Sequence, residues 1–210
     1  MSKTISGAQL KAAIGRAATA LRANYDLLTE LDQVLGDGDL GITANKVAET
    51  LLANIETVEP DLGKLLAQGG MAVNRAASST MGTLIATALV RAGKEIRGKE
   101  KLEAADLGRM LESADQGIQE RGKAHLGDKT VIDVLHPASE AFVAALAEGA
   151  SLEEAGRRMA AAARAGRDSV TPLRNRVGRA SWQGERTEGK VDPGCTLALI
   201  VLEAIAGVPG

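Results

Sequence analysis

Apolar residues recur at steps of three and four along most of this chain, and this spacing constrains the fold more than any other feature. In the opening segment, residues 5–34, the series is Ile5, Leu10, Ala13, Ile14, Ala17, Leu21, Leu27, Leu28 and Leu31. Such spacing puts one apolar stripe on a helix. We therefore expect an amphipathic helix over 5–34, with Gly7 and Gly15 as candidate interruptions.

Further helices are expected wherever the same spacing returns, at residues 42–58, 60–66, 83–96, 102–119, 130–146, 152–169 and 196–205. Ser151 is the expected N-cap of the helix from 152, and Glu154 would complete a capping box. No segment alternates apolar and polar residues as a strand does. The sequence therefore predicts an all-α fold of seven or eight helices in one domain, residues 1–210.

Composition excludes several classes of protein. The net charge is −2, and aromatic residues make up 1% of the chain, which argues against nucleic-acid binding through basic or stacking surfaces. No run of 18 apolar residues appears, and the N-terminus lacks the apolar stretch of a secretory signal. The single cysteine, Cys195, excludes an internal disulfide and is expected to pack as a small apolar residue. We expect a cytoplasmic protein without nucleic-acid or membrane partners.

The segment LDQVLGDGDLG brings three carboxylates, Asp32, Asp37 and Asp39, within eight residues. Carboxylates this close repel one another, and Mg²⁺, which prefers oxygen ligands, would offset that cost. A solvated acidic turn is the alternative, and spacing alone does not separate the two. The segment also matches G-x-G-x-x-G, but that dinucleotide fingerprint must follow a strand, whereas a helix precedes it here.

Two further segments could contact an anion. Residues 74–83, NRAASSTMGT, open an apolar helix with hydroxyl groups, which suits either anion binding or simple capping. Residues 171–194 form a long glycine-rich stretch that would suit closure over phosphates or an ordinary charged surface loop. Its basic residues are Arg174, Arg176, Arg179, Arg186 and Lys190.

The remaining candidate groups predict structural roles. His125 and His136 have no partner at zinc-ligand spacing and are expected on the surface or in packing. Asp128 and Lys129 could cap and charge the helix from Thr130, with Asp133 on its first turn. The chain has no nucleophile elbow, P-loop or HExxH motif.

Four stretches together resemble the nucleotide-binding L subunit of dihydroxyacetone kinases (DhaL) and the corresponding C-terminal domain of single-chain dihydroxyacetone kinases. They are LDQVLGDGDLG, AASSTMGT, RGKAHLGDKTVIDVLHPA and GRASWQGERTEGKVDPGCT, in order between about residues 5 and 207. The resemblance implies a closed antiparallel barrel or bundle of eight helices with the nucleotide at one end. It also implies that residues 171–194 are a capping loop.

The resemblance carries roles to individual positions. Asp32, Asp37 and Asp39 match aspartates that hold Mg²⁺ on the nucleotide phosphates. Arg179 matches the arginine of GRAS, a candidate catalytic residue that would also contact the nucleotide. The other positions matching nucleotide contacts are Leu40, Gly41, Ile42, Thr43, Ala76, Ala77, Ser78, Ser79, Gly122, Val131, Asp192, Pro193 and Gly194.

The chain departs from the family pattern near the phosphates. Leu40-Gly41 stands where the family often has His-Gly, and Thr43 replaces an asparagine, although Asn45 is retained. Residues 74–79, NRAASS, replace Gly-Gly-Ala-Ser-Gly-Pro, so that Ser78 or Ser79 would supply the hydroxyl. These changes leave the metal site intact and are compatible with a subfamily for another sugar, such as a tetrulose.

The function that the resemblance implies is phosphoryl transfer from Mg²⁺-bound ATP or ADP to a small ketose. A separate DhaK-type subunit would bind the ketose, and in some members a phosphocarrier subunit recharges the nucleotide. Two other functions stay open: a nucleotide-loaded regulatory subunit, and a Mg²⁺-dependent phosphohydrolase. A plain helical bundle would show no Mg²⁺-dependent ligand.

Overall fold

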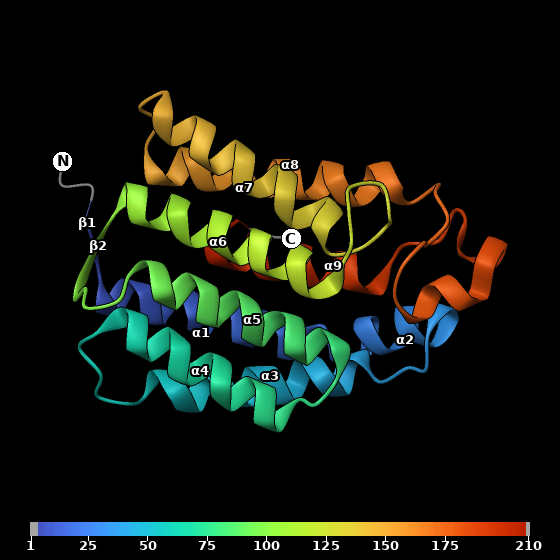
Figure 1. Ribbon diagram of the computed structural model, residues 1–210, viewed down its shortest axis with the longest axis horizontal. Helices are drawn as coiled ribbons and strands as arrows, with labels where there is room; N and C mark the ends of the chain where they lie inside the picture. The colour runs from blue at the N-terminus through green and yellow to red at the C-terminus, as the bar shows by residue number, and fades with distance from the viewer. Residues whose placement is uncertain (1–3, 209–210) are drawn as a thin grey trace.

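The computed structural model describes residues 4–208 and is helical apart from two short strands and the loops (Figure 1). The helices are α1 (Gly7–Ala23), α2 (Tyr25–Leu35), α3 (Leu40–Ile55), α4 (Leu62–Ala76), α5 (Thr80–Glu95), α6 (Ala104–Gly122), α7 (Ile132–Ala147), α8 (Leu152–Val170), the 3₁₀ segment η1 (Arg179–Thr187) and α9 (Pro193–Ala206). The strands β1 (Thr4–Ser6) and β2 (Lys101–Glu103) pair antiparallel, with Ile5 opposite Leu102.

Eight of the helices form a closed ring. Contacts run in the order α1, α3, α4, α5, α6, α7, α8, α9 and back to α1, and successive helices run in opposite directions (Figure 1). The predicted all-α closed antiparallel barrel of about eight helices is therefore confirmed. The α2 helix is not a member of the ring. It lies at one end, beside η1.

The expected break in the opening helix was placed wrongly. The helix over 5–34 ends at Asn24, where α2 begins, rather than at Gly7 or Gly15. The Asn24 side-chain amide donates to the Ala20 carbonyl at 2.9 Å, and an asparagine that competes for backbone groups in this way disfavours helix continuation. Ser6 caps α1 through the Gln9 N–H, so Gly7 is its first residue.

Three other local expectations differ from the structure. The strands β1 and β2 were missed, because three residues are too few for an alternating pattern to be recognised. The helix expected over 60–66 extends to Ala76 as α4. Ser151 does cap α8, accepting from the Glu154 N–H at 3.1 Å, but the Glu154 carboxylate pairs with Arg157 and Arg158 and does not complete a capping box.

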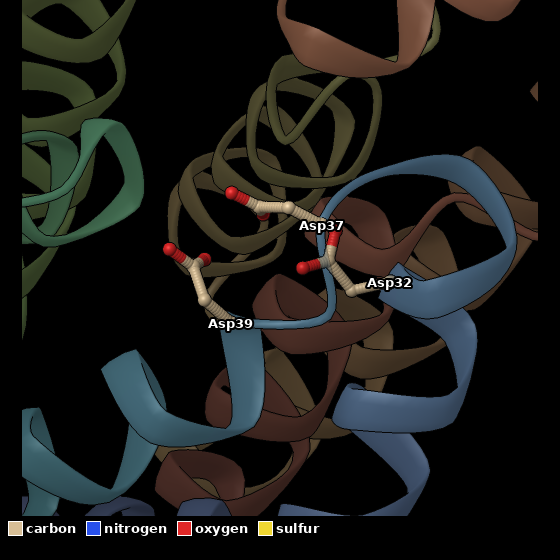
Figure 2. Close-up of side chains that lie close together, drawn as sticks. All are labelled: Asp32, Asp37 and Asp39. Atoms are coloured by element: carbon tan, nitrogen blue, oxygen red, sulfur yellow. The ribbon is translucent and has the colours of Figure 1, made fainter.

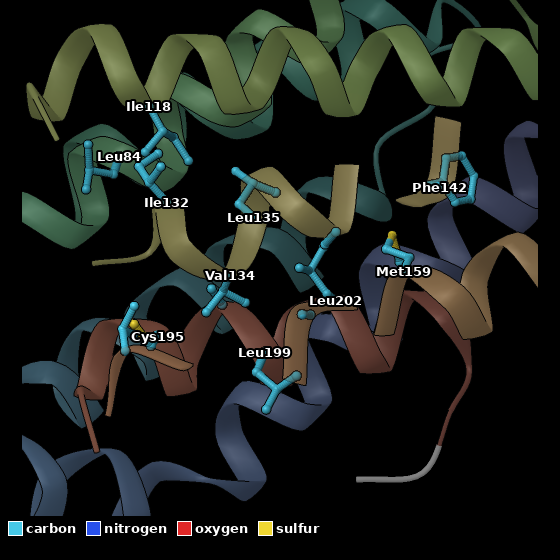
Figure 3. Close-up of a cluster of buried hydrophobic side chains, with 14 of the residues drawn as sticks. Leu84, Ile118, Ile132, Val134, Leu135, Phe142, Met159, Cys195, Leu199 and Leu202 are labelled. Carbon is cyan, nitrogen blue, oxygen red and sulfur yellow. The ribbon is translucent and has the colours of Figure 1, made fainter. Parts of the chain in front are cut away.

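Apolar side chains fill the inside of the ring. Figure 3 shows one cluster, in which Leu84 and Ile118 from α5 and α6 meet residues of α7, α8 and α9. Cys195 is fully buried in it, as predicted, and its thiol donates to the Thr130 carbonyl at 3.0 Å. Within residues 4–208, no helix has the length and apolar composition to cross a membrane.

Candidate functional site

Four helix N-termini gather at one end of the ring. The helices α3, α5, α7 and α9 all begin at the end where α2 and the 171–194 loop lie (Figure 1). Because each helix N-terminus carries a partial positive charge and unpaired N–H groups, this end is suited to an anion. The residues of the candidate site lie on these helix starts, at the ends of α2, α4 and α6, and in the connections that follow them.

The three aspartates converge at this end. Asp32 lies near the end of α2, Asp37 in the turn after it, and Asp39 at the N-cap of α3 (Figure 2). One carboxylate oxygen from each lies within 4.8 Å of the others. The turn that brings them together needs Gly38, whose φ of 77° is unfavourable for residues with a side chain. The Leu40 N–H donates to Asp32 at 3.1 Å and fixes its carboxylate against the start of α3.

Arg179, at the start of η1, reaches this cluster from the 171–194 loop. Its guanidinium pairs with Asp37 and lies 3.8 Å from Asp39. The side chains of Arg179, Asp37 and Asp39 are each about half exposed, at 52%, 50% and 48%. One guanidinium leaves the three carboxylates with an excess of negative charge. Three hard oxygen donors open to solvent fit a divalent cation such as Mg²⁺.

The first turn of α3 lies directly behind the carboxylates. Leu40, Gly41 and Thr43 are buried there, and Ile42 is exposed. A side chain at Gly41 would collide with Thr29 and with the Tyr25 carbonyl, so glycine lets α3 lie close to α2. The Asp39 side chain makes no capping hydrogen bond with this turn, since it faces the other carboxylates.

The departures from the family pattern meet one another in space. The Thr43 hydroxyl donates to the Ser79 hydroxyl at 3.1 Å, which joins the start of α3 to the start of α5. Ser79 in turn caps α5 by accepting from the Gly82 N–H at 3.1 Å. Ala77 is buried, whereas Ala76 and Ser78 are exposed. Of the two candidate serines, Ser79 therefore joins α3 to α5, whereas Ser78 is an exposed residue.

The other predicted positions lie on the α6, α7 and α9 side of the same end. Gly122 is the last residue of α6, and Val131 is the half-buried N-cap of α7. Asp192 caps α9, accepting from the Cys195 N–H at 2.8 Å and from the Asn175 amide at 2.7 Å. Burial raises the pKa of Asp192 above its ordinary value. Pro193 and Gly194 form the buried first turn of α9.

The roles expected for Asp128 and Lys129 were wrong. The Asp128 carboxylate accepts from the His125 N–H at 2.8 Å and does not cap α7. Asp133, on the first turn of α7, accepts from the Thr130 N–H at 2.7 Å, and no side chain caps the helix at its N-cap residue, Val131. Lys129 is fully buried and contacts the 171–194 loop. The only sequence signal for this residue was its place in GDKT.

The two histidines have the structural roles that were expected. His125 is exposed at the α6–α7 connection. His136 packs between α6 and α7, where its Nδ1 lies 2.7 Å from the Asp115 carboxylate. That hydrogen bond raises the pKa of His136 above its ordinary value.

Comparison with known proteins gives a family match and several relatives. The DAK2 domain model matches residues 34–207. The ADP-binding subunit DhaL of the PEP-dependent dihydroxyacetone kinase of Escherichia coli is 28% identical over 204 residues, 97% of each chain. The corresponding subunit of kinase 1 of Listeria innocua is 33% identical over 186 residues, 88% of each chain. The L-erythrulose kinase of Pectobacterium atrosepticum is 29% identical, and the match covers 94% of this chain and 34% of that protein.

Solved structures share the fold. The dihydroxyacetone kinase of C. freundii superposes with a TM-score of 0.74 at 24% identity, covering 99% of this chain and 35% of the other. Its complex with AMP-PNP and Mg²⁺ gives a TM-score of 0.71 at 22% identity. At these identities the likeness supports the fold alone.

Proposed function

Because this chain belongs to the DAK2 domain family, we propose that it is the nucleotide-binding, phosphoryl-transferring subunit of a kinase for dihydroxyacetone or a related short ketose. The observation that carries the proposal is the convergence of Asp32, Asp37 and Asp39, with Arg179 beside them, at the end where four helices begin. A site for a nucleoside diphosphate or triphosphate needs oxygen ligands that hold Mg²⁺ and N–H groups that bind the phosphate oxygens.

Each group at the site would contribute to charge neutralisation and positioning, which dominate phosphoryl transfer. Mg²⁺ bound to the three aspartates would screen the phosphate oxygens and polarise the transferred group. Arg179 is half exposed and can exchange its Asp37 partner for a phosphate oxygen. The Leu40 and Gly82 N–H groups already have side-chain acceptors, so the remaining N–H groups in the first turns of α3 and α5 would hold the nonbridging oxygens.

The remaining nucleotide contacts follow the family pattern and are part of the proposal. The first turn of α3, residues 40–43, and the segment 76–79 would contact the phosphates. Gly122 and Val131 would line the adenine side, and Asp192, Pro193 and Gly194 would complete the site at the start of α9. The 171–194 loop would act as the cap of this one nucleotide-binding domain and exclude water from the transferred group.

The ketose-binding subunit would be a separate DhaK-type protein. Three relatives matched along 84% or more of their own length are named as ADP-binding DhaL subunits of PEP-dependent kinases, and a fourth is named as the DhaL subunit of a PTS-dependent kinase. We therefore include in the proposal that ADP stays bound and that a phosphocarrier protein recharges it to ATP. We also propose that the chain is cytoplasmic, because the nucleotide and the phosphocarrier that such a subunit would use are found in the cytoplasm.

Calorimetric titration of ADP and ATP into the purified, nucleotide-free chain tests the nucleotide site. We expect binding in Mg²⁺ that EDTA abolishes and that Asp37→Asn weakens at least about tenfold. Asp26→Asn, which removes an acidic side chain at the other end of α2, is the matched control and should bind normally. Absence of Mg²⁺-dependent binding by the folded chain would overturn the proposal.

A coupled assay with a DhaK-type subunit then separates the candidate activities. Phosphorylation of dihydroxyacetone or a tetrulose only when both proteins are present supports the kinase subunit. Phosphate release without the second protein would instead indicate a phosphohydrolase. Nucleotide binding without either activity would indicate the regulatory alternative.

A further inference from the structure

The side chain of Lys129 is the most unusual group in the described part of the chain that the proposed chemistry does not use. It is 0% exposed and is among the largest fully buried side chains. Lysine is rarely buried completely, because removing an ammonium from water is costly unless its hydrogen bonds are replaced. Its backbone also has a φ of 61°, in the left-handed region that residues with a side chain seldom adopt.

All three ammonium protons of Lys129 have acceptors, and all three acceptors belong to the 171–194 loop. Nζ donates to the carbonyls of Thr171 at 2.9 Å, Leu173 at 2.8 Å and Thr187 at 2.6 Å. The first two carbonyls lie where the loop leaves α8, and the third lies at the end of η1. One side chain therefore joins the two ends of the segment that carries Arg179.

The backbone of the 128–129 connection strengthens the same junction. The Asn175 amide donates to the Lys129 carbonyl at 2.8 Å and to Asp192 at 2.7 Å. The Arg176 N–H donates to the Asp128 carbonyl at 3.0 Å. Within residues 4–208 no carboxylate accepts a hydrogen bond from the ammonium, but the negative charge of Asp192 favours the charged form of the lysine and so acts to raise its pKa. Burial nevertheless lowers the pKa of Lys129, so the lysine bears a desolvation cost that its loop contacts must offset.

We propose that Lys129 is a positioning residue that holds the 171–194 loop closed and thereby keeps Arg179 against Asp37 and Asp39. Its ammonium donates to loop carbonyls and not to Asp32, Asp37 or Asp39, so it acts on that cluster through the loop. A surface lysine would close this loop less well, since water would compete for the three carbonyls. The expected effect of Lys129 on nucleotide affinity rests on the proposed function, whereas its expected effect on the position of the 171–194 loop does not.

The chain contains its own reporter for the test. Trp182 is its single tryptophan, lies in η1, and is 88% exposed. Fluorescence anisotropy of Trp182 therefore reports on motion of the loop, while far-ultraviolet circular dichroism reports on the ring of helices. Tryptic cleavage within 171–194 gives a second measure of opening, because the loop contains several arginines.

The variant Lys129→Met retains the length and apolar stem of the side chain and removes its three donors. We expect unchanged helical content, lower Trp182 anisotropy, faster tryptic cleavage within 171–194, and Mg²⁺·ADP affinity reduced about tenfold or more. Lys123→Met is the matched control, since Lys123 lies in the same connection, also has a positive φ, and is exposed. It should leave the anisotropy and the loop cleavage unchanged.

Two outcomes would overturn the proposal. In the first, Lys129→Met leaves both the Trp182 anisotropy and the loop cleavage unchanged. In the second, Lys123→Met changes both as much as Lys129→Met does. If Lys129→Met does not fold, Lys129→Gln replaces it, because glutamine keeps a polar group there but is one bond shorter and has only two donors for the three carbonyls, so the junction is still weakened. Unchanged anisotropy in that variant would likewise overturn the proposal. Loop opening in a chain whose wild type binds no Mg²⁺·ADP would support the role of Lys129 and contradict the proposed function.

Discussion

The Leu40 N–H donates a 3.1 Å hydrogen bond to the Asp32 carboxylate, and this bond connects the end of α2 to the first turn of α3. Asp32 therefore has a structural role in addition to its proposed role as a metal ligand. Asp37, by contrast, pairs with Arg179 at the surface. In the absence of a ligand, Asp32 therefore contributes a hydrogen bond between two helices, whereas Asp37 contributes a surface ion pair.

Asp32→Ala should lower the free energy of unfolding by about 1 kcal/mol, because the Leu40 N–H loses its acceptor. Asp37→Ala removes only a half-exposed ion pair and should change the free energy of unfolding by less than about 0.5 kcal/mol. Urea unfolding of both variants in EDTA measures the difference. Equal losses would show that the Leu40 hydrogen bond contributes nothing to stability.

Mg²⁺ should stabilise the folded chain even without nucleotide. A ligand that binds only the folded state raises the melting temperature, here by about 5 °C or more at a concentration 100-fold above its dissociation constant. Replacing both Asp37 and Asp39 with asparagine should abolish this shift, because two of the three carboxylates are lost. Differential scanning calorimetry with and without Mg²⁺ measures it, with Asp26→Asn as the control that keeps the shift.

Arg179→Ala should reduce the turnover of the reconstituted kinase by at least about 100-fold, since an arginine at the transferred phosphate stabilises the transition state. Arg186→Ala is the matched control, because Arg186 is an exposed arginine in the same η1 segment. Steady-state kinetics with a DhaK-type subunit and ketose compares the two. Similar effects of both substitutions would mean that general loop charge, rather than Arg179, is responsible.

The His136–Asp115 pair should make stability depend on pH in a definite direction. The hydrogen bond to Asp115 raises the pKa of folded His136 above its unfolded value near 6.5. The stabilisation is therefore fully present below about pH 6.5 and is lost as the pH rises through the folded pKa. His136→Gln should cost more unfolding free energy at about pH 6 than at about pH 9. A cost that is independent of pH would contradict the prediction.

Gly166→Ala should be strongly destabilising. Pro137 has no N–H to offer the Asp133 carbonyl, and Gly166 on α8 lies so close that an added Cβ would collide with that oxygen. We expect a loss of about 2–3 kcal/mol, typical of overpacking. Gly156→Ala, in the same helix, would bring its Cβ to 3.4 Å from the Ala206 methyl and should change stability by less than about 0.5 kcal/mol. Chemical denaturation compares the two variants.

Much of the fold and of the candidate site could be predicted from local sequence. Periodic apolar spacing predicts helices because the hydrogen bonds of a helix join residues four apart. Most expected segments correspond to observed helices with shifted ends, but residues 5–34 divide into α1 and α2, and the segment 60–66 covers only the first part of α4. The proximity of Asp32, Asp37 and Asp39 likewise follows from their eight-residue span. The burial of Cys195 follows from its apolar surroundings in the sequence.

Only the tertiary structure decided which distant groups meet. Arg179 reaches Asp37, Thr43 reaches Ser79, and Lys129 donates to carbonyls on either side of η1. The sequence marked Arg179, Thr43 and Ser79 as candidate nucleotide contacts and Lys129 as a residue that could cap or charge a helix, but it named none of these pairings. The physical reason is that spacing determines which face of a helix is apolar, whereas the environment of a charged side chain depends on segments packed against it from elsewhere. Sequence therefore determined the helices and the carboxylate cluster of this protein, and closure of the ring determined the partners of its loop residues.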